Sequence, residues 1–160
     1  MRFFYTKLNN FMWKHSFIRS CIHFTSRFCP YMVAIFYMLF LLKIYLDRPY
    51  DLLILIAEPL AVFTITLILR IVINRKRPSE KYDLIPIGER RKIGHSFPSI
   101  HVAISTSIAL SVLRSGPNMG LLLSTLAGAI TFTSLTSGVH YITDILASIA
   151  IAFIININVF

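Results

Sequence analysis

Residues 94–103 read Gly-His-Ser-Phe-Pro-Ser-Ile-His-Val-Ala and join a basic loop to an apolar segment. Pro98 fixes φ for a first helical turn and has no N–H to leave unpaired there. The N–H groups of Ser99, Ile100 and His101 would then point out of a helix end with partial positive charge, which predicts an anion site. Ser99 adds a hydroxyl, and His101 adds a group that titrates near neutral pH. Taken alone, the stretch also allows a plain helix start with incidental histidines.

The composition is that of a multi-pass membrane protein. Of 160 residues, 56% are hydrophobic, and the mean hydropathy is +0.69, which is too apolar for an ordinary soluble domain. The net charge is +9, and eight of the 16 Lys and Arg residues lie between positions 70 and 92. A basic cluster between membrane spans suits lipid headgroups or a phosphorylated substrate, so we expect membrane-lipid partners and no nucleic acid.

The apolar runs predict an all-α integral membrane protein with about five transmembrane helices. The expected spans are residues 30–46, 52–73, 98–114, 119–136 and 140–160. Residues 1–29 mix aromatic and basic side chains without an acidic one, which predicts an N-terminal amphipathic helix on the membrane surface. A simple topogenic leader is the alternative. The expected organisation is a surface segment, residues 1–29, and one membrane domain, residues 30–160.

Two charged residues, Lys43 and Glu58, lie inside the first and second expected spans. An ionisable residue at membrane depth is often functional. Glu58 is about 9 Å from the start of its span, on the side away from the basic loop. Lys43 is at a similar depth on the antiparallel neighbour, so we expect the two to form a structural pair.

Successive spans alternate in direction, so the ends of the second and fourth spans meet the starts of the third and fifth at one membrane face. Arg70 and Arg77 are seven residues apart near the end of the second span. They would share a helix face, about 10 Å apart along the axis, if the helix continued to Pro78. Two guanidinium groups on one side suit a phosphate. For Arg75 and Lys76 we expect anchoring to anionic headgroups instead.

His140 and Asp144, four residues apart, lie at the start of the fifth span on the same face of the membrane. An aspartate in this position can fix the tautomer of the imidazole and leave its other nitrogen as a nucleophile or base. A buried His–Asp pair that only stabilises a helix start is the alternative. With the arginines and the helix start, these groups suffice for phosphoryl transfer through a phosphohistidine. No carboxylate cluster suggests a metal site, and no cofactor is expected.

Three patterns resemble the type 2 phosphatidic acid phosphatase superfamily, which includes lipid phosphatases, undecaprenyl pyrophosphate phosphatases and vanadium haloperoxidases. The family patterns are Lys-x6-Arg-Pro, Pro-Ser-Gly-His and Ser-Arg-x5-His-x3-Asp. This chain has Arg70-x6-Arg77-Pro78, Pro98-Ser99-Ile100-His101 and Thr133-Ser134-x5-His140-x3-Asp144. The resemblance covers roughly residues 52–155 and implies a membrane phosphatase acting on a lipid phosphate or pyrophosphate, of the polyprenyl or phosphatidate type.

The resemblance also implies roles for the matching residues. His140 would attack phosphorus, Asp144 would orient it, and His101 would protonate the leaving oxygen. The phosphoryl oxygens would be held by Arg70, Arg77, Ser99 and the backbone N–H of Ile100, which stands where the family has Gly.

Ser134 is the most serious departure, because it replaces the third-motif Arg that clamps phosphate in the family. Loss of such a clamp commonly costs orders of magnitude in rate. Cations that could replace it are Arg75, Lys81, Arg90, Arg91 and Lys92, and His95 is a further auxiliary candidate. The departure keeps a weakly active or inactive lipid-phosphate-binding scaffold as an alternative. A lipid phosphotransferase with the same site is another.

The active-site face is expected to be extracytoplasmic in the cell membrane. The positive-inside rule by itself places residues 1–29 and 74–97 in the cytoplasm. Phosphate binding would account for part of the loop charge, however, and the members that the chain resembles and that act on polyprenyl pyrophosphate have this face outside.

Overall fold

The computed structural model describes residues 2–88 and 93–158 and builds them from helices. The helices are α1 (Arg2–Lys14), α2 (Ser16–Asp47), the short 3-10 helix η1 (Pro49–Asp51), α3 (Leu52–Ile73), α4 (Pro78–Lys81), α5 (Ile100–Ser115), α6 (Pro117–Thr136) and α7 (Ile142–Asn158). By length and composition, α2, the stretch Pro49–Lys81 and α6 could each cross a membrane, and α5 and α7 are shorter apolar helices. The predicted all-α membrane fold is confirmed.

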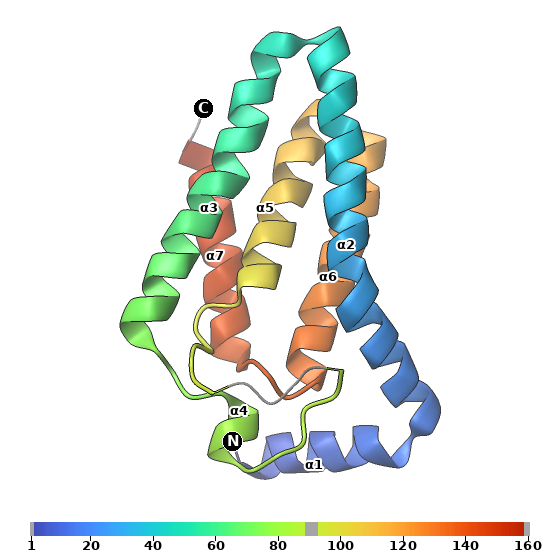
Figure 1. Cartoon of the computed structure of the whole chain (residues 1–160), viewed down its shortest axis with the longest axis vertical. Coiled ribbons are helices and arrows are strands. Elements are labelled where there is room, and N and C mark those ends of the chain that lie inside the picture. The colour runs from blue at the N-terminus through green and yellow to red at the C-terminus, as the bar shows by residue number, and fades with distance from the viewer. Residues whose placement is uncertain (1, 89–92, 159–160) are drawn as a thin grey trace.

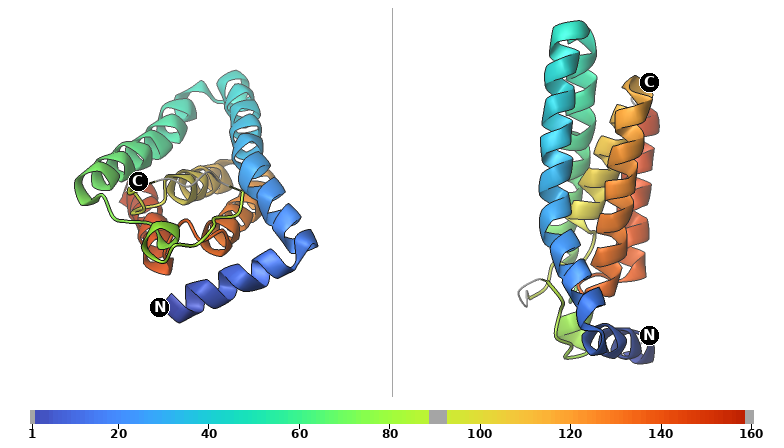
Figure 2. Two further views of the ribbon diagram at one scale, coloured as in Figure 1. Left: turned by 60° about the horizontal axis from the view of Figure 1, so that its bottom comes forward. Right: turned by 90° about the vertical axis from the view of Figure 1, so that its right-hand side faces the viewer.

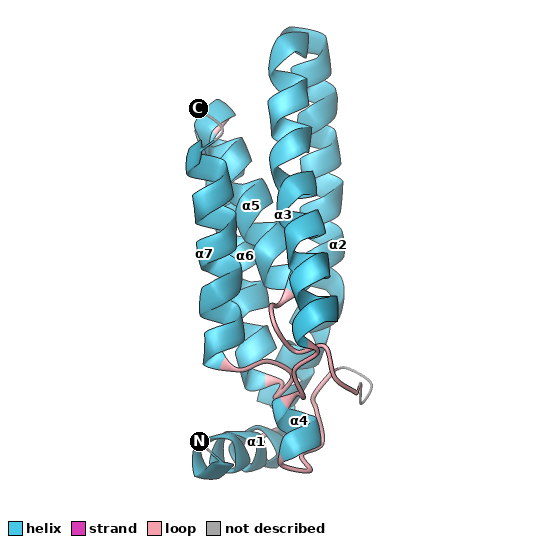
Figure 3. Ribbon diagram, turned by 90° about the vertical axis from the view of Figure 1, so that its left-hand side faces the viewer, coloured by secondary structure: helices cyan, strands magenta, loops and turns pink. Residues whose placement is uncertain are grey.

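The bundle is formed by helices that run lengthwise, namely α2, α3, α5, α6 and α7, and α1 lies across one end of them (Figure 1). α2 and α3 form a hairpin that extends beyond the other helices at its η1 end (Figure 3). α5 contacts α2, α3, α6 and α7 and is therefore the central helix. α1, α4 and the loops before α5 and α7 gather at the end of the bundle opposite η1 (Figures 1 and 2).

The lateral surface of the bundle is apolar and its interior is partly polar. Ile35, Met38 and Leu42 of α2 are exposed, whereas Ser107 and Ser111 of α5 are fully buried. A bilayer favours this arrangement, because lipid solvates apolar side chains and small polar residues allow helices to approach closely.

The expected pair of Glu58 and Lys43, based on their similar membrane depth, does not form. Lys43 is exposed, whereas Glu58 is fully buried, forms an ion pair with Arg114 and accepts a hydrogen bond from Ser111. Arg114 also donates to the carbonyl of Asn156 at 3.0 Å. α3 packs mainly along α5 and not along α2, so the side chain that reaches Glu58 comes from a helix that is distant in sequence.

The surface helix is shorter than the expected segment 1–29. α1 ends at Lys14, and residues 16–29 already belong to α2, which continues through Pro30 to Asp47. His15 has extended backbone angles (φ −106°, ψ 97°) and separates the two helices. The turn there allows α1 to lie across the end of the bundle (Figure 2).

Candidate active site

Arg70 and Arg77 reach the same cleft, although the helix does not continue from one to the other. α3 ends at Ile73, because Asn74 adopts the left-handed conformation (φ 39°, ψ 48°), and Arg77 follows in extended backbone. The expected placement on one helix face is therefore wrong, and a turn brings the two side chains together. The cleft has a volume of about 490 Å³ and is lined by Leu67, Arg70, Ile71, Arg77, Ile93, Gly94, His95 and Ile100.

Backbone carbonyls of the loop before α5 accept hydrogen bonds from both arginines. Arg77 is 3% exposed, and its Nε donates to the carbonyl of Gly94 at 3.2 Å. Arg70 is half-buried, and its Nη1 lies 3.4 Å from the carbonyl of Pro98. Each guanidinium is therefore oriented by a carbonyl of the segment that carries the second motif.

α5 begins at Ile100, two residues later than the sequence predicted from Pro98. Ser99 is the N-cap residue in extended backbone, and its N–H donates to Ser148 Oγ at 2.8 Å. The Ser99 N–H is thus used within the protein and does not join the predicted anion site. The N–H of Ile100 lies in the first turn, where a helix offers no acceptor of its own, and Ile100 lines the cleft.

The Ser99 hydroxyl is buried and has no hydrogen-bond partner within the described part of the chain. A buried hydroxyl without a partner costs free energy, and such groups are often found at functional sites. Ser99 directly precedes Ile100 of the cleft, so a bound oxyanion near the helix start would supply the missing partner.

His140 lies in the loop between α6 and α7 and is 4% exposed. Its Nδ1 is 2.7 Å from the carbonyl oxygen of Ser96 and 3.8 Å from Asp144 Oδ2. A carbonyl accepts only, so Nδ1 carries the proton and the lone pair of the neutral ring is on Nε2. The nearer orienting group is thus the Ser96 backbone, whereas Asp144 lies beyond normal hydrogen-bond distance.

Burial lowers the pKa of the His140 imidazole below its ordinary value. Asp144 opposes this effect, and the cations of Arg77 and Arg70 add to it. His140 is therefore neutral at neutral pH, which is the protonation state that a nucleophile needs.

Asp144 is fully buried and collects three hydrogen bonds that involve its carboxylate oxygens. It accepts from Ser96 Oγ at 2.5 Å, from the N–H of Tyr141 at 3.0 Å and from Arg75 Nη1 at 2.7 Å. The headgroup anchoring that we expected for Arg75 is therefore wrong, because this side chain turns inward to the carboxylate.

The remaining predicted residues are His95, which lines the cleft, three residues on α4, α5 and α6, and three that lie outside the described part of the chain. His101 is exposed on the first turn of α5, and Lys81 is exposed on α4 with its Nζ 5.8 Å from the ring centre of Tyr82. His95 is exposed, and its Nδ1 lies 3.1 Å from the carbonyl of Arg70. Ser134 is half-buried in the last turn of α6. Arg90, Arg91 and Lys92 lie outside the described residues.

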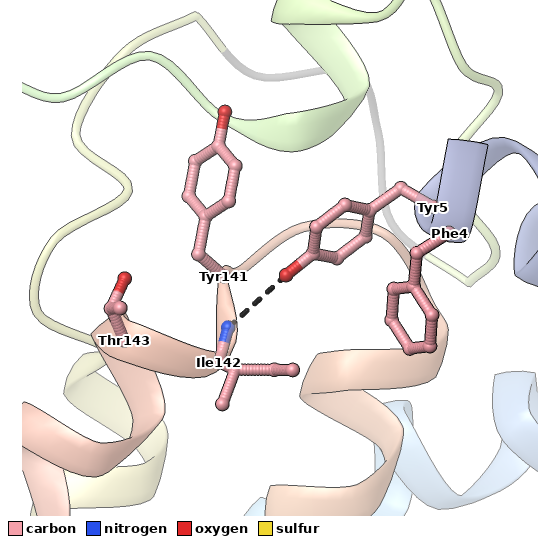
Figure 4. Close-up of a pocket in the computed structure, with 5 residues that line it drawn as sticks. All are labelled: Phe4, Tyr5, Tyr141, Ile142 and Thr143. Carbon is pink, nitrogen blue, oxygen red and sulfur yellow. Dashed lines mark hydrogen bonds between the residues drawn. The ribbon is translucent and has the colours of Figure 1, made fainter. Parts of the chain in front are cut away.

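The surface helix α1 contacts the segment that carries His140. The Tyr5 hydroxyl accepts a hydrogen bond from the N–H of Ile142 at 3.2 Å (Figure 4). The Tyr5 and Tyr141 rings meet edge to face with centres 5.6 Å apart. Burial raises the pKa of Tyr5, so the hydroxyl remains protonated at neutral pH. Beside these rings is a cavity of about 230 Å³ lined by Phe4, Tyr5, Tyr141, Ile142 and Thr143 (Figure 4).

Sequence reasoning missed the residues that act through the backbone or through a neighbour. Ser96 stands two residues before Pro98, but nothing in the sequence shows that its carbonyl would meet His140. Ser148, one turn after Asp144 on α7, also had no signal beyond its small polar side chain. Within residues 2–88 and 93–158, no group of three or more His, Cys, Asp and Glu side chains is arranged to hold a metal ion.

Comparison with known proteins gives a family match and two structural matches. Residues 81–157 match the model of the PAP2 superfamily. The crystal structure of Aquifex aeolicus LpxE is similar with a TM-score of 0.76 and 19% identity, over 96% of this chain and 90% of that one. The crystal structure described as that of the first transmembrane PAP2 type phosphatidylglycerolphosphate phosphatase from Bacillus subtilis is similar with a TM-score of 0.57 and 18% identity. The similarity extends over 97% of this chain and 90% of that one. Among curated proteins, no significant match is found.

PAP2 stands for type 2 phosphatidic acid phosphatase, so the predicted resemblance to this superfamily is confirmed. The PAP2 match begins at Lys81 and thus includes the second and third motifs. Arg70 and Arg77 precede the matched residues, so their assignment to the first PAP2 motif rests on their spacing and on the cleft that they share with Ile100.

Proposed function

We propose that this protein is a membrane phosphatase that hydrolyses a lipid phosphate or pyrophosphate through a phosphohistidine intermediate. The observation that carries the proposal is the mixed character of the cleft. Arg70 and Arg77 lie in it together with Leu67 and Ile71 of α3, which are 37% and 62% exposed on the lateral surface. Two cations beside apolar, lipid-facing side chains suit a substrate whose phosphate lies at the headgroup level and whose tail stays in the bilayer.

In the first chemical step, the Nε2 lone pair of His140 forms a bond to phosphorus as the bond from phosphorus to the leaving oxygen breaks. The hydrogen bond from Nδ1 to the Ser96 carbonyl supports this step, because it holds the ring and stabilises the positive charge that develops on it. His101 donates a proton to the leaving oxygen and so releases it as the alcohol, or as the monophosphate if the substrate is a pyrophosphate.

In the second step, water attacks the phosphohistidine and the P–N bond breaks. His101, now unprotonated, accepts the proton of the water, and inorganic phosphate leaves. Arg70 and Arg77 stabilise the charge on the phosphoryl oxygens in both steps, and Ser99 with the N–H of Ile100 completes the cradle. One structural neighbour is by its name a phosphatidylglycerolphosphate phosphatase, and a lipid phosphate of that kind or a polyprenyl pyrophosphate fits the same arrangement.

The reaction is proposed to need no metal, since the cations of the cleft can supply the charge stabilisation that a metal provides in other phosphatases. We also propose that the cleft opens at the extracytoplasmic face of the cell membrane. Accessibility of tags at the two termini in intact cells tests the orientation.

A non-catalytic scaffold that binds lipid phosphate is the second candidate, and Ser134 is the observation that favours it. The resemblance places a phosphate-clamping arginine at this position, whereas Ser134 offers only a hydroxyl in the last turn of α6. A scaffold would bind lipid phosphate and release no phosphate.

The test is phosphate release from a panel of lipid phosphates and pyrophosphates by the purified protein in detergent. Release that His140→Ala abolishes, with membrane insertion intact, supports the phosphohistidine mechanism, and a fully active His140→Ala protein contradicts it. Binding without release supports the scaffold. Product analysis without an added alcohol acceptor separates the hydrolase from a phosphotransferase, because the transferase would form no product under these conditions.

A further inference from the structure

Arg75 makes defined contacts beside His140, although none of the three family patterns includes this residue. Its Nη1 donates to Asp144 Oδ1 at 2.7 Å and lies 2.8 Å from Thr143 Oγ1, and its guanidinium lies 4.0 Å from the ring centre of Tyr141. The Asp144 side chain is fully buried and the Arg75 side chain is 37% exposed. A buried carboxylate needs a counter-charge, and the side chain of Arg75 provides it.

The same contacts form a closed ring with Ser96. The Ser96 N–H donates to the Arg75 carbonyl at 2.8 Å, and Ser96 Oγ donates to Asp144 Oδ2 at 2.5 Å. The Ser96 carbonyl is the group that meets His140 Nδ1. The Arg75 backbone and the Asp144 carboxylate therefore hold Ser96 from both sides, and the Arg75 side chain in turn holds the carboxylate.

We propose that Arg75 is a positioning residue for His140, which acts through Asp144 and Ser96 and fixes the tautomer with the lone pair on Nε2. This inference rests on the proposed phosphohistidine function. It also separates two kinds of cation in the site. Arg70 and Arg77 line the cleft that would receive phosphate, whereas Arg75 does not line it and is directed to a carboxylate. Arg75 thus does not replace the clamp that is missing at Ser134.

A kinetic comparison tests the assignment with Arg75→Gln, Arg75→Lys and the control Lys76→Gln. Lys76 is the exposed neighbour, so its variant removes the same charge without touching Asp144. With a lipid phosphate that the wild-type protein hydrolyses, we expect Arg75→Gln to lower kcat by about tenfold or more with KM changed less than about twofold. Arg75→Lys should recover part of kcat, and Lys76→Gln should match the wild-type protein. A rise in KM at unchanged kcat would make Arg75 a phosphate clamp and overturn the proposal.

A second readout does not depend on activity. Nitrogen NMR of histidine-labelled protein in detergent distinguishes the two neutral tautomers of His140, with His140→Ala identifying the signal. We expect the Nδ1–H form in the wild-type protein and a mixture in Arg75→Gln. An unchanged tautomer in a folded Arg75→Gln protein would overturn the positioning role. If instead the tautomer changes but His140→Ala is fully active, the proposed phosphohistidine function fails while the structural role of Arg75 stands.

Discussion

The hydroxyl of Tyr5 accepts a hydrogen bond from the N–H of Ile142, a residue 137 positions away in the sequence. Ile142 is the first residue of α7, where the N–H has no acceptor within the helix. The surface helix therefore stabilises the start of the helix that carries Asp144, at a position two residues after His140. The N-terminal segment thus contacts the part of the chain that carries His140 and Asp144.

Tyr5→Phe removes this acceptor but keeps the aromatic contacts with Tyr141. We expect a loss of about 1–2 kcal/mol in stability, because the Ile142 N–H is left without its partner, and a lower kcat. Thermal unfolding in detergent and phosphate release measure the two effects. Tyr31→Phe is the control, since Tyr31 is 66% exposed on α2. If the two variants have equal stability and equal kcat, Tyr5 of α1 does not support the site.

The pH dependence follows from the lowered pKa of His140. In the proposed mechanism the neutral imidazole is the nucleophile, so activity should fall as the pH drops through this pKa. We expect the acidic limb of kcat/KM to have its midpoint below about 6.5, the ordinary value for histidine. A pH series with a water-soluble short-chain lipid phosphate locates the limb. A midpoint well above 6.5 would contradict a buried, cation-flanked nucleophile.

Ser134→Arg tests whether the missing clamp is compensated by the loop. If Arg90, Arg91 and Lys92 supply the charge, Ser134→Arg should raise kcat/KM little, and neutralising these three residues should lower it at least about tenfold, equivalent to about 1.4 kcal/mol. We expect this pair of results. A large gain from Ser134→Arg together with a neutral triple variant would show instead that the site lacks a cation.

Chelators and vanadate distinguish the proposed chemistry from a metal-dependent one. Activity should persist in EDTA, because guanidinium groups provide the charge stabilisation. Vanadate should inhibit, because its five-coordinate form resembles the transition state held by the same donors. Loss of all activity in EDTA, with recovery on addition of magnesium, would refute this assignment.

Glu58→Ala tests the buried ion pair with Arg114 at the other end of the bundle. Removing the carboxylate leaves the partly buried Arg114 without its counter-charge and Ser111 without one of its two side-chain partners, which should cost about 3 kcal/mol. Lys43→Ala is the matched control, because Lys43 is the partner that membrane depth suggested and it is exposed. The melting temperature in detergent should fall strongly for the first variant and hardly for the second. Equal shifts would contradict the pairing.

Hydropathy predicted the helices well where a span is long and uninterrupted. The expected span 52–73 coincides with α3, because an apolar run bounded by charged turns defines both ends in the sequence. The start of α5 and the division of residues 1–29 were predicted less well. Both depend on local backbone angles at Ser99 and His15, which apolar periodicity does not encode.

The site was predictable to the extent that alternating helix directions bring motif residues to one end of the bundle. Arg70, Arg77 and Ile100 do line one cleft. The contact of the Ser96 carbonyl with His140 was not predictable, because a backbone group carries no sequence signal. The Arg75–Asp144 pair was missed for a related reason. Spacing along one helix cannot show which side chain crosses from a loop 69 positions away.

The position of α5 at the centre of the bundle has a consequence for how the chain enters the membrane during synthesis. α5 has 16 residues, several of them serines, and ends next to Arg114. Alone in lipid, such a segment would leave its hydroxyls and its guanidinium poorly solvated. A Cβ on Gly120 would lie 2.3 Å from Leu113 Cα, so α6 packs directly on α5 beyond a tight turn. We therefore expect the two helices to insert as one hairpin, with α5 completing its polar contacts when α3 and α7 pack against it.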